Sequence, residues 1–203
     1  MNCSPKTTIR LPARLTHVVT LSLCVFVTFS SCDPERLQYT RELKSEISDK
    51  KPKRVTNAQL NEAVNSWGEQ IAAVAEAELM AKLKQGGDKT GFCRLENLPK
   101  TTAIAQRYGL SIGLLGAADV TNSRLATKER DVLDAYLYNA ENKLAQQPNI
   151  QKIADTMFVY NAAVPTENII CQSCFGTQKT PLAVWRLAFT KRELVRRLNL
   201  KKK

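Results

Sequence analysis

Two cysteines, Cys171 and Cys174, are separated by two residues within the stretch NIICQSCFGT at positions 168–177. A Cys-x-x-Cys pair is typical of a redox dithiol, a disulfide or half of a metal site, and a histidine directly after it indicates c-type haem attachment. That next position holds Phe175, whose phenyl ring cannot bind iron. A further cysteine, Cys93, lies far upstream in the sequence GFC. The pair therefore raises three possibilities, namely a haem site, a thiol–disulfide site and a structural role.

The residues around the pair argue against a thioredoxin-type or zinc site. A thioredoxin-type pair needs a helix N-terminus to lower the pKa of its first thiol, whereas ENIIC at 167–171 is strand-like and FGTQKTP after the pair is typical of a loop. A zinc ribbon needs a second Cys-x-x-Cys, which the chain lacks. We therefore predict no metal. From the motif alone, a local disulfide or two reduced buried cysteines is the favoured interpretation in an exported protein.

The first 32 residues have the pattern of a bacterial lipoprotein leader. Lys6, Arg10 and Arg14 precede the apolar stretch VVTLSLCVFVTFSSC, which is too short to span a bilayer comfortably. FSSC at its end resembles a lipobox, in which the cysteine is acylated and becomes the first residue of the mature protein. We predict that Cys32 attaches the chain to membrane lipid on the periplasmic side of the bacterial cell envelope, since several acyl chains give stable anchoring. Which membrane carries it is left open.

Removal of this leader narrows the possible chemistry. His17, the only histidine, leaves with it, so the mature chain has no imidazole for a general base, a catalytic triad or a His-ligated metal. Three cations and no acid leave too, and the formal net charge falls from +11 to +8. This basic balance does not predict nucleic-acid binding, because an exported lipoprotein rarely meets nucleic acid and no such motif is present. The basic C-terminal end indicates either a solvated tail or contact with anionic lipids.

The mature chain is predicted to hold one α+β domain behind a tether. Thr56 and Gln59 form a capping-box pattern at the start of a long amphipathic helix that ends at Gly86-Gly87. Shorter helices and antiparallel strands with short connections follow, which favours a single sheet. The predicted organisation is a signal peptide at 1–31, a flexible tether at 32–55 and a domain at 56–203. After the long helix, the domain is predicted to have a helix over 90–108 interrupted near Pro99, a third helix capped by Thr127 and a basic closing helix. Its predicted strands are LSIGLL, DTMFVYNAAV, ENIIC and LAVWRLAFT.

The order of these segments resembles a family of exported, PAS-like domains that bind c-type haem. The resemblance spans residues 57–198 and is best in FVYNAAVPTENIICQSCFG, where Tyr160, Val164, Cys171, Cys174 and Gly176 coincide with the family's motif. The sequence GLLGAADVTNS at 113–123 lacks the family's Arg-Asn-Pro pattern, with only Asn122 in a corresponding place. The resemblance implies a PAS-like antiparallel sheet flanked by N-terminal long helices.

The same resemblance assigns roles to the cysteines. Cys171 and Cys174 would form thioethers to haem, Cys93 would be an axial ligand of the iron, and Phe175 stands where the family has its second, histidine ligand. We therefore expect a haem site that has degenerated, with no cofactor in the native protein and haem c as the alternative. The predicted function is a sensor or binding module, not an enzyme, for an unknown small ligand or envelope partner. The alternative is a redox protein, either an atypical c-type cytochrome or a dithiol module that uses these three cysteines.

Overall fold

The computed structural model describes residues 40–46 and 54–200. The predicted signal peptide at 1–31 and the lipid-attachment residue Cys32 lie outside the described residues, as does most of the predicted tether. Residues 40–46, within that tether, form a short helical segment. Residues 54–200 carry all the strands and the remaining helices of the described chain.

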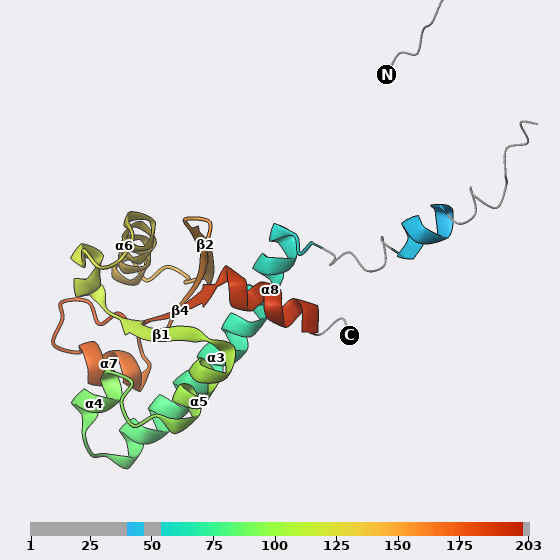
Figure 1. Ribbon diagram of the computed structural model, residues 1–203. Coiled ribbons are helices and arrows are strands. Elements are labelled where there is room, and N and C mark those ends of the chain that lie inside the picture. Colours follow the sequence, from blue (N-terminus) through green and yellow to red (C-terminus); the bar gives the residue numbers. More distant parts are fainter. Residues whose placement is uncertain (1–39, 47–53, 201–203) are drawn as a thin grey trace, which may run out of the picture. The chain divides into compact units, whose positions relative to one another are not determined.

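Helices come first in the domain, and strands alternate with helices after them (Figure 1). The elements are α3 (Asn57–Gln85), α4 (Lys89–Cys93), α5 (Pro99–Tyr108), β1 (Leu110–Leu115), the 3-10 helix η1 (Ala117–Thr121), α6 (Thr127–Glu141), β2 (Asn149–Ile153), β3 (Met157–Ala163), α7 (Ile169–Phe175), β4 (Val184–Thr190) and α8 (Lys191–Leu200).

The four strands form one antiparallel sheet in the order β1-β4-β3-β2. The last strand of the chain, β4, lies in the interior of the sheet and pairs along its length with both β1 and β3. This arrangement confirms the predicted α+β class with a single antiparallel sheet. The PAS-like character of the sheet remains an expectation from the sequence.

Helix α3 begins as its sequence predicts. The Thr56 hydroxyl accepts a hydrogen bond from the Gln59 backbone N–H at 3.2 Å, and the Gln59 side chain accepts one from the Thr56 N–H at 3.1 Å. These two bonds satisfy backbone donors that have no partner within the helix. Along the helix, an apolar stripe at three- and four-residue spacing is buried between α3 and the sheet and helices that pack on it; it consists of Leu60, Val64, Trp67, Ile71, Ala75, Leu79 and Leu83.

A glycine lets α3 approach the sheet closely. Gly68 lies over the ring of Tyr160 on β3, and a Cβ atom placed on Gly68 would come within 2.5 Å of the Tyr160 Cγ atom. Tyr160 is only 2% exposed, so its ring has little room to move. Close packing of this kind has a direct consequence for stability, because a buried ring cannot yield to an added methyl group without shifting its neighbours.

Helix α5 takes its N-terminal cap from another helix. The buried Glu78 carboxylate of α3 accepts hydrogen bonds from the backbone N–H groups of Lys100 at 2.9 Å and Thr101 at 2.7 Å, and from the Thr101 hydroxyl at 2.8 Å. A carboxylate at this end of a helix is stabilised by the free N–H groups and by the helix dipole. Glu78 therefore fixes the start of α5 on α3.

Helix α6 packs on the sheet through a buried ion pair. The Glu129 carboxylate, near the start of α6, lies 2.7 Å from the Arg186 Nε atom of β4 and also accepts a hydrogen bond from the Ala126 N–H at 3.0 Å. Farther along α6, the Tyr136 hydroxyl lies within hydrogen-bond distance of two backbone carbonyls, that of Gln147 at 2.7 Å and that of Asn161 at 3.1 Å. Apolar side chains of α6 and the sheet, among them Leu133 and Val184, form a second, smaller core there.

The structure corrects several predicted elements. ENIIC does not continue as a strand, because the Asn168 side chain caps a helix, α7, that contains both Cys171 and Cys174. The predicted helix over 90–108 is two helices, α4 and α5, separated by residues 94–98. Strand β2 (Asn149–Ile153), which pairs with β3, was not predicted. Thr127 is the first residue of α6, and Ala126 stands at its cap position.

We predict that Gly68→Ala destabilises the domain. The new methyl group would overlap the buried Tyr160 ring, which costs about 1–3 kcal/mol, while the gain in helix propensity returns about 1 kcal/mol. Urea denaturation followed by circular dichroism should show a lower midpoint.

The matched control is Gly113→Ala on β1, where an added Cβ atom meets no atom within 4 Å. This variant should unfold close to the native midpoint. A Gly68→Ala protein as stable as the native one would contradict the packing of α3 on Tyr160.

Candidate functional site

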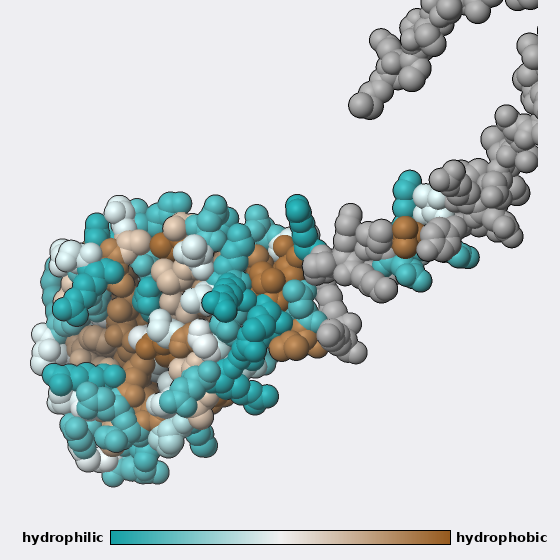
Figure 2. Space-filling model, viewed as in Figure 1, coloured by the Kyte–Doolittle hydropathy of each residue, from teal (hydrophilic) through white to brown (hydrophobic). Residues whose placement is uncertain are grey.

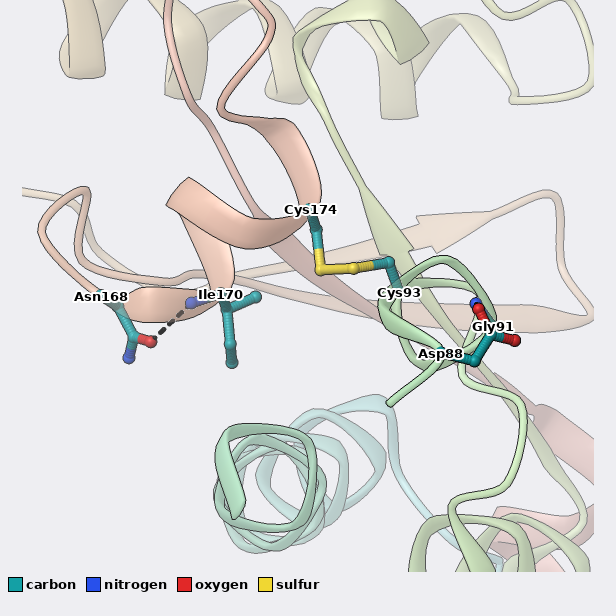
Figure 3. Close-up of a disulfide and its surroundings, with 6 residues drawn as sticks. All are labelled: Asp88, Gly91, Cys93, Asn168, Ile170 and Cys174. Atoms are coloured by element: carbon teal, nitrogen blue, oxygen red, sulfur yellow. Dashed lines mark hydrogen bonds between the residues drawn. A yellow bond between two sulfur atoms is a disulfide. The ribbon is translucent and has the colours of Figure 1, made fainter. Parts of the chain in front are cut away.

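A disulfide joins Cys93, the last residue of α4, to Cys174 in α7 (Figure 3). The two Cα atoms are 5.5 Å apart and the cysteines are 81 positions apart in the sequence. Both residues are half-buried. The structure thus brings together two of the three cysteines that the sequence singled out, and it connects them covalently.

The disulfide is not the local one that the Cys-x-x-Cys spacing favoured. Cys171 and Cys174 are both in α7, where residues three apart lie on adjoining parts of the helix surface. Cys171 is fully buried as a free thiol, whereas Cys174 is only half-buried and bonds to α4. The motif had favoured a local Cys171–Cys174 disulfide or two reduced buried cysteines; the local disulfide was wrong, and of the two cysteines only Cys171 is reduced and buried.

The thiol of Cys171 is held inside the protein. Its Sγ atom lies 3.4 Å from the carbonyl oxygen of Pro165 and 3.8 Å from that of Val164, to which it donates. Burial, together with the nearby carboxylates of Glu76 and Glu167, raises the pKa of the Cys171 thiol to about 11. A thiol in this setting stays protonated near neutral pH and is a poor nucleophile.

Asn168 positions α7. Its side-chain oxygen accepts a hydrogen bond from the Ile170 N–H at 3.0 Å, which starts the helix (Figure 3), and its side-chain nitrogen donates to the Glu76 carboxylate of α3 at 2.9 Å. Burial raises the pKa of Glu76. One side chain therefore both caps α7 and fixes its start against α3.

At the other end of α7, Phe175 packs on the chain that follows β1. A Cβ atom on Gly116 would collide with the Phe175 ring, so the ring lies directly against the Gly116 backbone. Close by, the Gln178 side chain accepts a hydrogen bond from the Ala117 N–H at 3.0 Å. Phe175, which the resemblance places at the position of a histidine ligand, is in this structure a packing residue between α7 and the η1 segment.

The residues in this arrangement do not fit haem. The family resemblance would place Cys93 on the iron and Cys174 on the edge of the porphyrin, but the two sulfurs are bonded to each other. Cys171, the other thioether position, has its thiol turned to the carbonyls of Val164 and Pro165. Asn122 bonds to Asp119 and to the Arg124 backbone within its own loop. Haem attachment would require the disulfide to break and Cys171 to leave the core.

A groove of about 290 Å³ runs beside the disulfide. Figure 2 shows a hollow with apolar side chains, bordered by hydrophilic ones, over the region where α4, α7 and β1 lie in Figure 1. The groove includes both bonded cysteines, the cations Lys89 and Arg94, and no acidic residue; it is lined by Lys89, Thr90, Cys93, Arg94, Leu114, Ser173, Cys174 and Phe175.

No cluster of three or more His, Cys, Asp or Glu side chains suited to a metal ion occurs among residues 40–46 and 54–200. In the same part of the chain, no helix is both long and apolar enough to cross a membrane.

Comparison of the chain with protein-family models, with curated proteins and with solved structures found no match.

Sequence reasoning missed the residues that position the cysteines. Glu76 and Asn168 meet only through the tertiary fold, because 92 positions separate them. The motif Asn168-Ile-Ile-Cys did contain a signal, since asparagine is a favoured N-cap residue, but the β-branched Ile169 and Ile170 suggested a strand. Lys89 and Arg94 gave no signal, because isolated surface cations are common.

Removing the disulfide should lower stability strongly. By the chain-entropy relation, a bridge that closes a loop of this length contributes about 4 kcal/mol. We therefore expect the double variant Cys93→Ala/Cys174→Ala to unfold at a much lower urea concentration than the native protein.

The control is Cys171→Ala, which keeps the bridge and removes only a buried sulfur. Its stability should fall by far less than that of the double variant. Equal losses in the two variants would contradict a Cys93–Cys174 bridge.

The buried Cys171 thiol should make the domain less stable in alkali. Its ordinary pKa of 9.0 applies to the unfolded chain and its folded pKa is about 11. Because the unfolded state loses this proton first, stability is complete below pH 9 and declines as the pH rises toward 11. At pH 10 this ionisation lowers the free energy of unfolding by about 1.4 kcal/mol relative to its value below pH 9.

Urea unfolding at pH 8 and pH 10 provides the measurement, with Cys171→Ala as the reference. The native protein should lose more stability between the two pH values than this variant does. The same loss in both proteins would show that Cys171 is not the titrating group.

Proposed function

We propose that this chain is a lipid-anchored protein of the bacterial cell envelope whose α+β domain is a sensor or binding module. The domain uses a scaffold derived from the haem-binding family and has a disulfide where those relatives hold haem. Cys32 carries the lipid, residues 33–55 form the tether, and the domain faces the periplasm. The observation that carries the proposal is the Cys93–Cys174 disulfide.

The disulfide supports two parts of this proposal. Disulfides persist in oxidising compartments such as the periplasm, which agrees with the export signal before Cys32. The bridge also connects the two positions that the resemblance assigns to the iron and to the porphyrin edge. A scaffold that has lost its histidine ligand thereby keeps α4 and α7 together without a cofactor.

The packing around the bridge supports the same interpretation. Phe175 lies against Gly116, where an imidazole ligand is expected from the resemblance. Full burial of a phenylalanine side chain contributes about 1.5–3 kcal/mol, and the half-buried Phe175 contributes part of that. The disulfide and this ring together stabilise a region that haem contacts would otherwise organise.

The proposal can be tested by producing the full chain in a bacterium that also makes the c-type haem maturation machinery. We expect the protein to sediment with membranes and to dissolve in detergent. The purified protein should lack a haem Soret band, its N-terminal peptide should carry acyl chains on Cys32, and the peptides of Cys93 and Cys174 should be linked.

Cys32→Ala is the matched variant for the anchor, and it should give an uncleaved or a released protein with the same disulfide. Unchanged membrane partitioning of this variant, with no lipid on the native N-terminal peptide, would refute the anchor. Covalent haem on the native peptide of Cys171 and Cys174 would refute the replacement of haem by a disulfide.

A further inference from the structure

The Cys93–Cys174 bridge differs from a buried structural disulfide in its surroundings. Both cysteines are half-buried and both line the groove of about 290 Å³, so a small molecule in the groove lies beside the bridge. The apolar wall of the groove is formed by Leu114 and Phe175. A disulfide that is accessible in this way is open to attack by a thiolate.

Two cations flank the bridge. Lys89 lies one helical turn before Cys93 on α4 and Arg94 follows Cys93 directly, and both side chains are exposed. The ion pairs formed within residues 54–200 include neither of them. Positive charge beside a cysteine stabilises its thiolate and makes it a better leaving group. The same charge attracts an anionic reactant.

We propose that this groove is a thiol–disulfide exchange site for low-molecular-weight thiols that carry carboxylate groups. The carboxylates bind near Lys89 and Arg94, and the thiolate attacks the Cys174 sulfur. A new bond joins the external sulfur to Cys174, the Cys93–Cys174 bond breaks, and its electron pair leaves on Cys93. The exchange is stoichiometric, and it does not depend on the lipid anchor.

A second molecule of the same thiol completes the reduction. Its thiolate attacks the external sulfur of the mixed disulfide, forms the external disulfide and releases the Cys174 thiolate. Cys93 and Cys174 each take up one proton. The protein disulfide has then gained two electrons, and two external thiols have been oxidised to one disulfide.

Cys171 limits the exchange to external thiols. Although it is three positions before Cys174, its thiol is fully buried and donates to the carbonyls of Pro165 and Val164. It therefore does not attack the bridge in the folded resting protein. The bridge is stable until a thiol arrives from outside, and the charges of the groove select which thiol that is.

The experiment uses the oxidised full chain and two probes, glutathione as an anionic thiol and cysteamine as a cationic one. Samples are quenched with acid, and the mixed disulfide and the reduced protein are quantified by mass spectrometry. The measured quantity is the ratio of the glutathione rate to the cysteamine rate, compared between protein variants, because this comparison cancels the intrinsic reactivity of each thiol.

The charge-reversal variant Lys89→Glu/Arg94→Glu should lower this ratio about fivefold or more, as expected for two surface charges. The control Arg124→Glu/Lys128→Glu reverses two exposed cations that do not line the groove and should leave the ratio unchanged. Circular dichroism checks that each variant is folded. If the double reversal unfolds the domain, the single variant Lys89→Gln answers the same question.

Peptide mapping identifies the sulfur that is attacked. The first adduct should be on Cys174, with Cys93 free for alkylation. A native bridge that reacts with neither thiol while the domain is folded would overturn the proposal and leave a purely structural disulfide. A ratio that the groove charges do not change would overturn it as well, and an adduct on Cys93 would overturn the assigned direction of attack.

Discussion

Helix α3 is the surface on which most of the domain is assembled. The sheet packs on it through the contact of Gly68 with the Tyr160 ring, and helices α4, α5, α7 and α8 all contact it. Two of its carboxylates are used for positioning, since Glu78 caps α5 and Glu76 binds the cap residue of α7. Of the two helices that carry the bonded cysteines, α7 is fixed on α3 by this hydrogen bond, and α4 also contacts α3.

This dependence explains why the bridge joins Cys174 to a cysteine 81 positions away and not to its neighbour in the motif. Asn168 starts α7 at a fixed place on α3, and the helical turn then places Cys171 in the core and Cys174 at the edge of α4. The Asp88 side chain accepts a hydrogen bond from the Gly91 N–H at 3.0 Å and so caps α4, which packs against α7. The disulfide adds a covalent bond to an arrangement that hydrogen bonds and packing also stabilise.

The sequence was a good guide to elements with a strong local signal. The capping box and apolar stripe predicted α3, and the apolar segments of β1, β3 and β4 predicted three of the four strands, which was enough for the α+β class. The sequence was a poor guide where long-range contacts determine the conformation of a segment or the pairing of a cysteine. The segment Asn168–Cys171 has strand-forming isoleucines but forms a helix because Glu76 and the Asn168 cap hold it there. Cys93 was recognised only through a family resemblance, and its bond to Cys174 has no local signal.

The different environments of the three cysteines determine what chemistry the domain keeps. Cys171 is excluded from solvent, and burial raises the pKa of its thiol to about 11, so it contributes packing and little reactivity. Cys93 and Cys174 share a half-buried bond next to two cations, which is the setting in which a disulfide is most readily exchanged. The exchange that we propose therefore involves Cys93 and Cys174, which line the groove, and leaves Cys171 in the core.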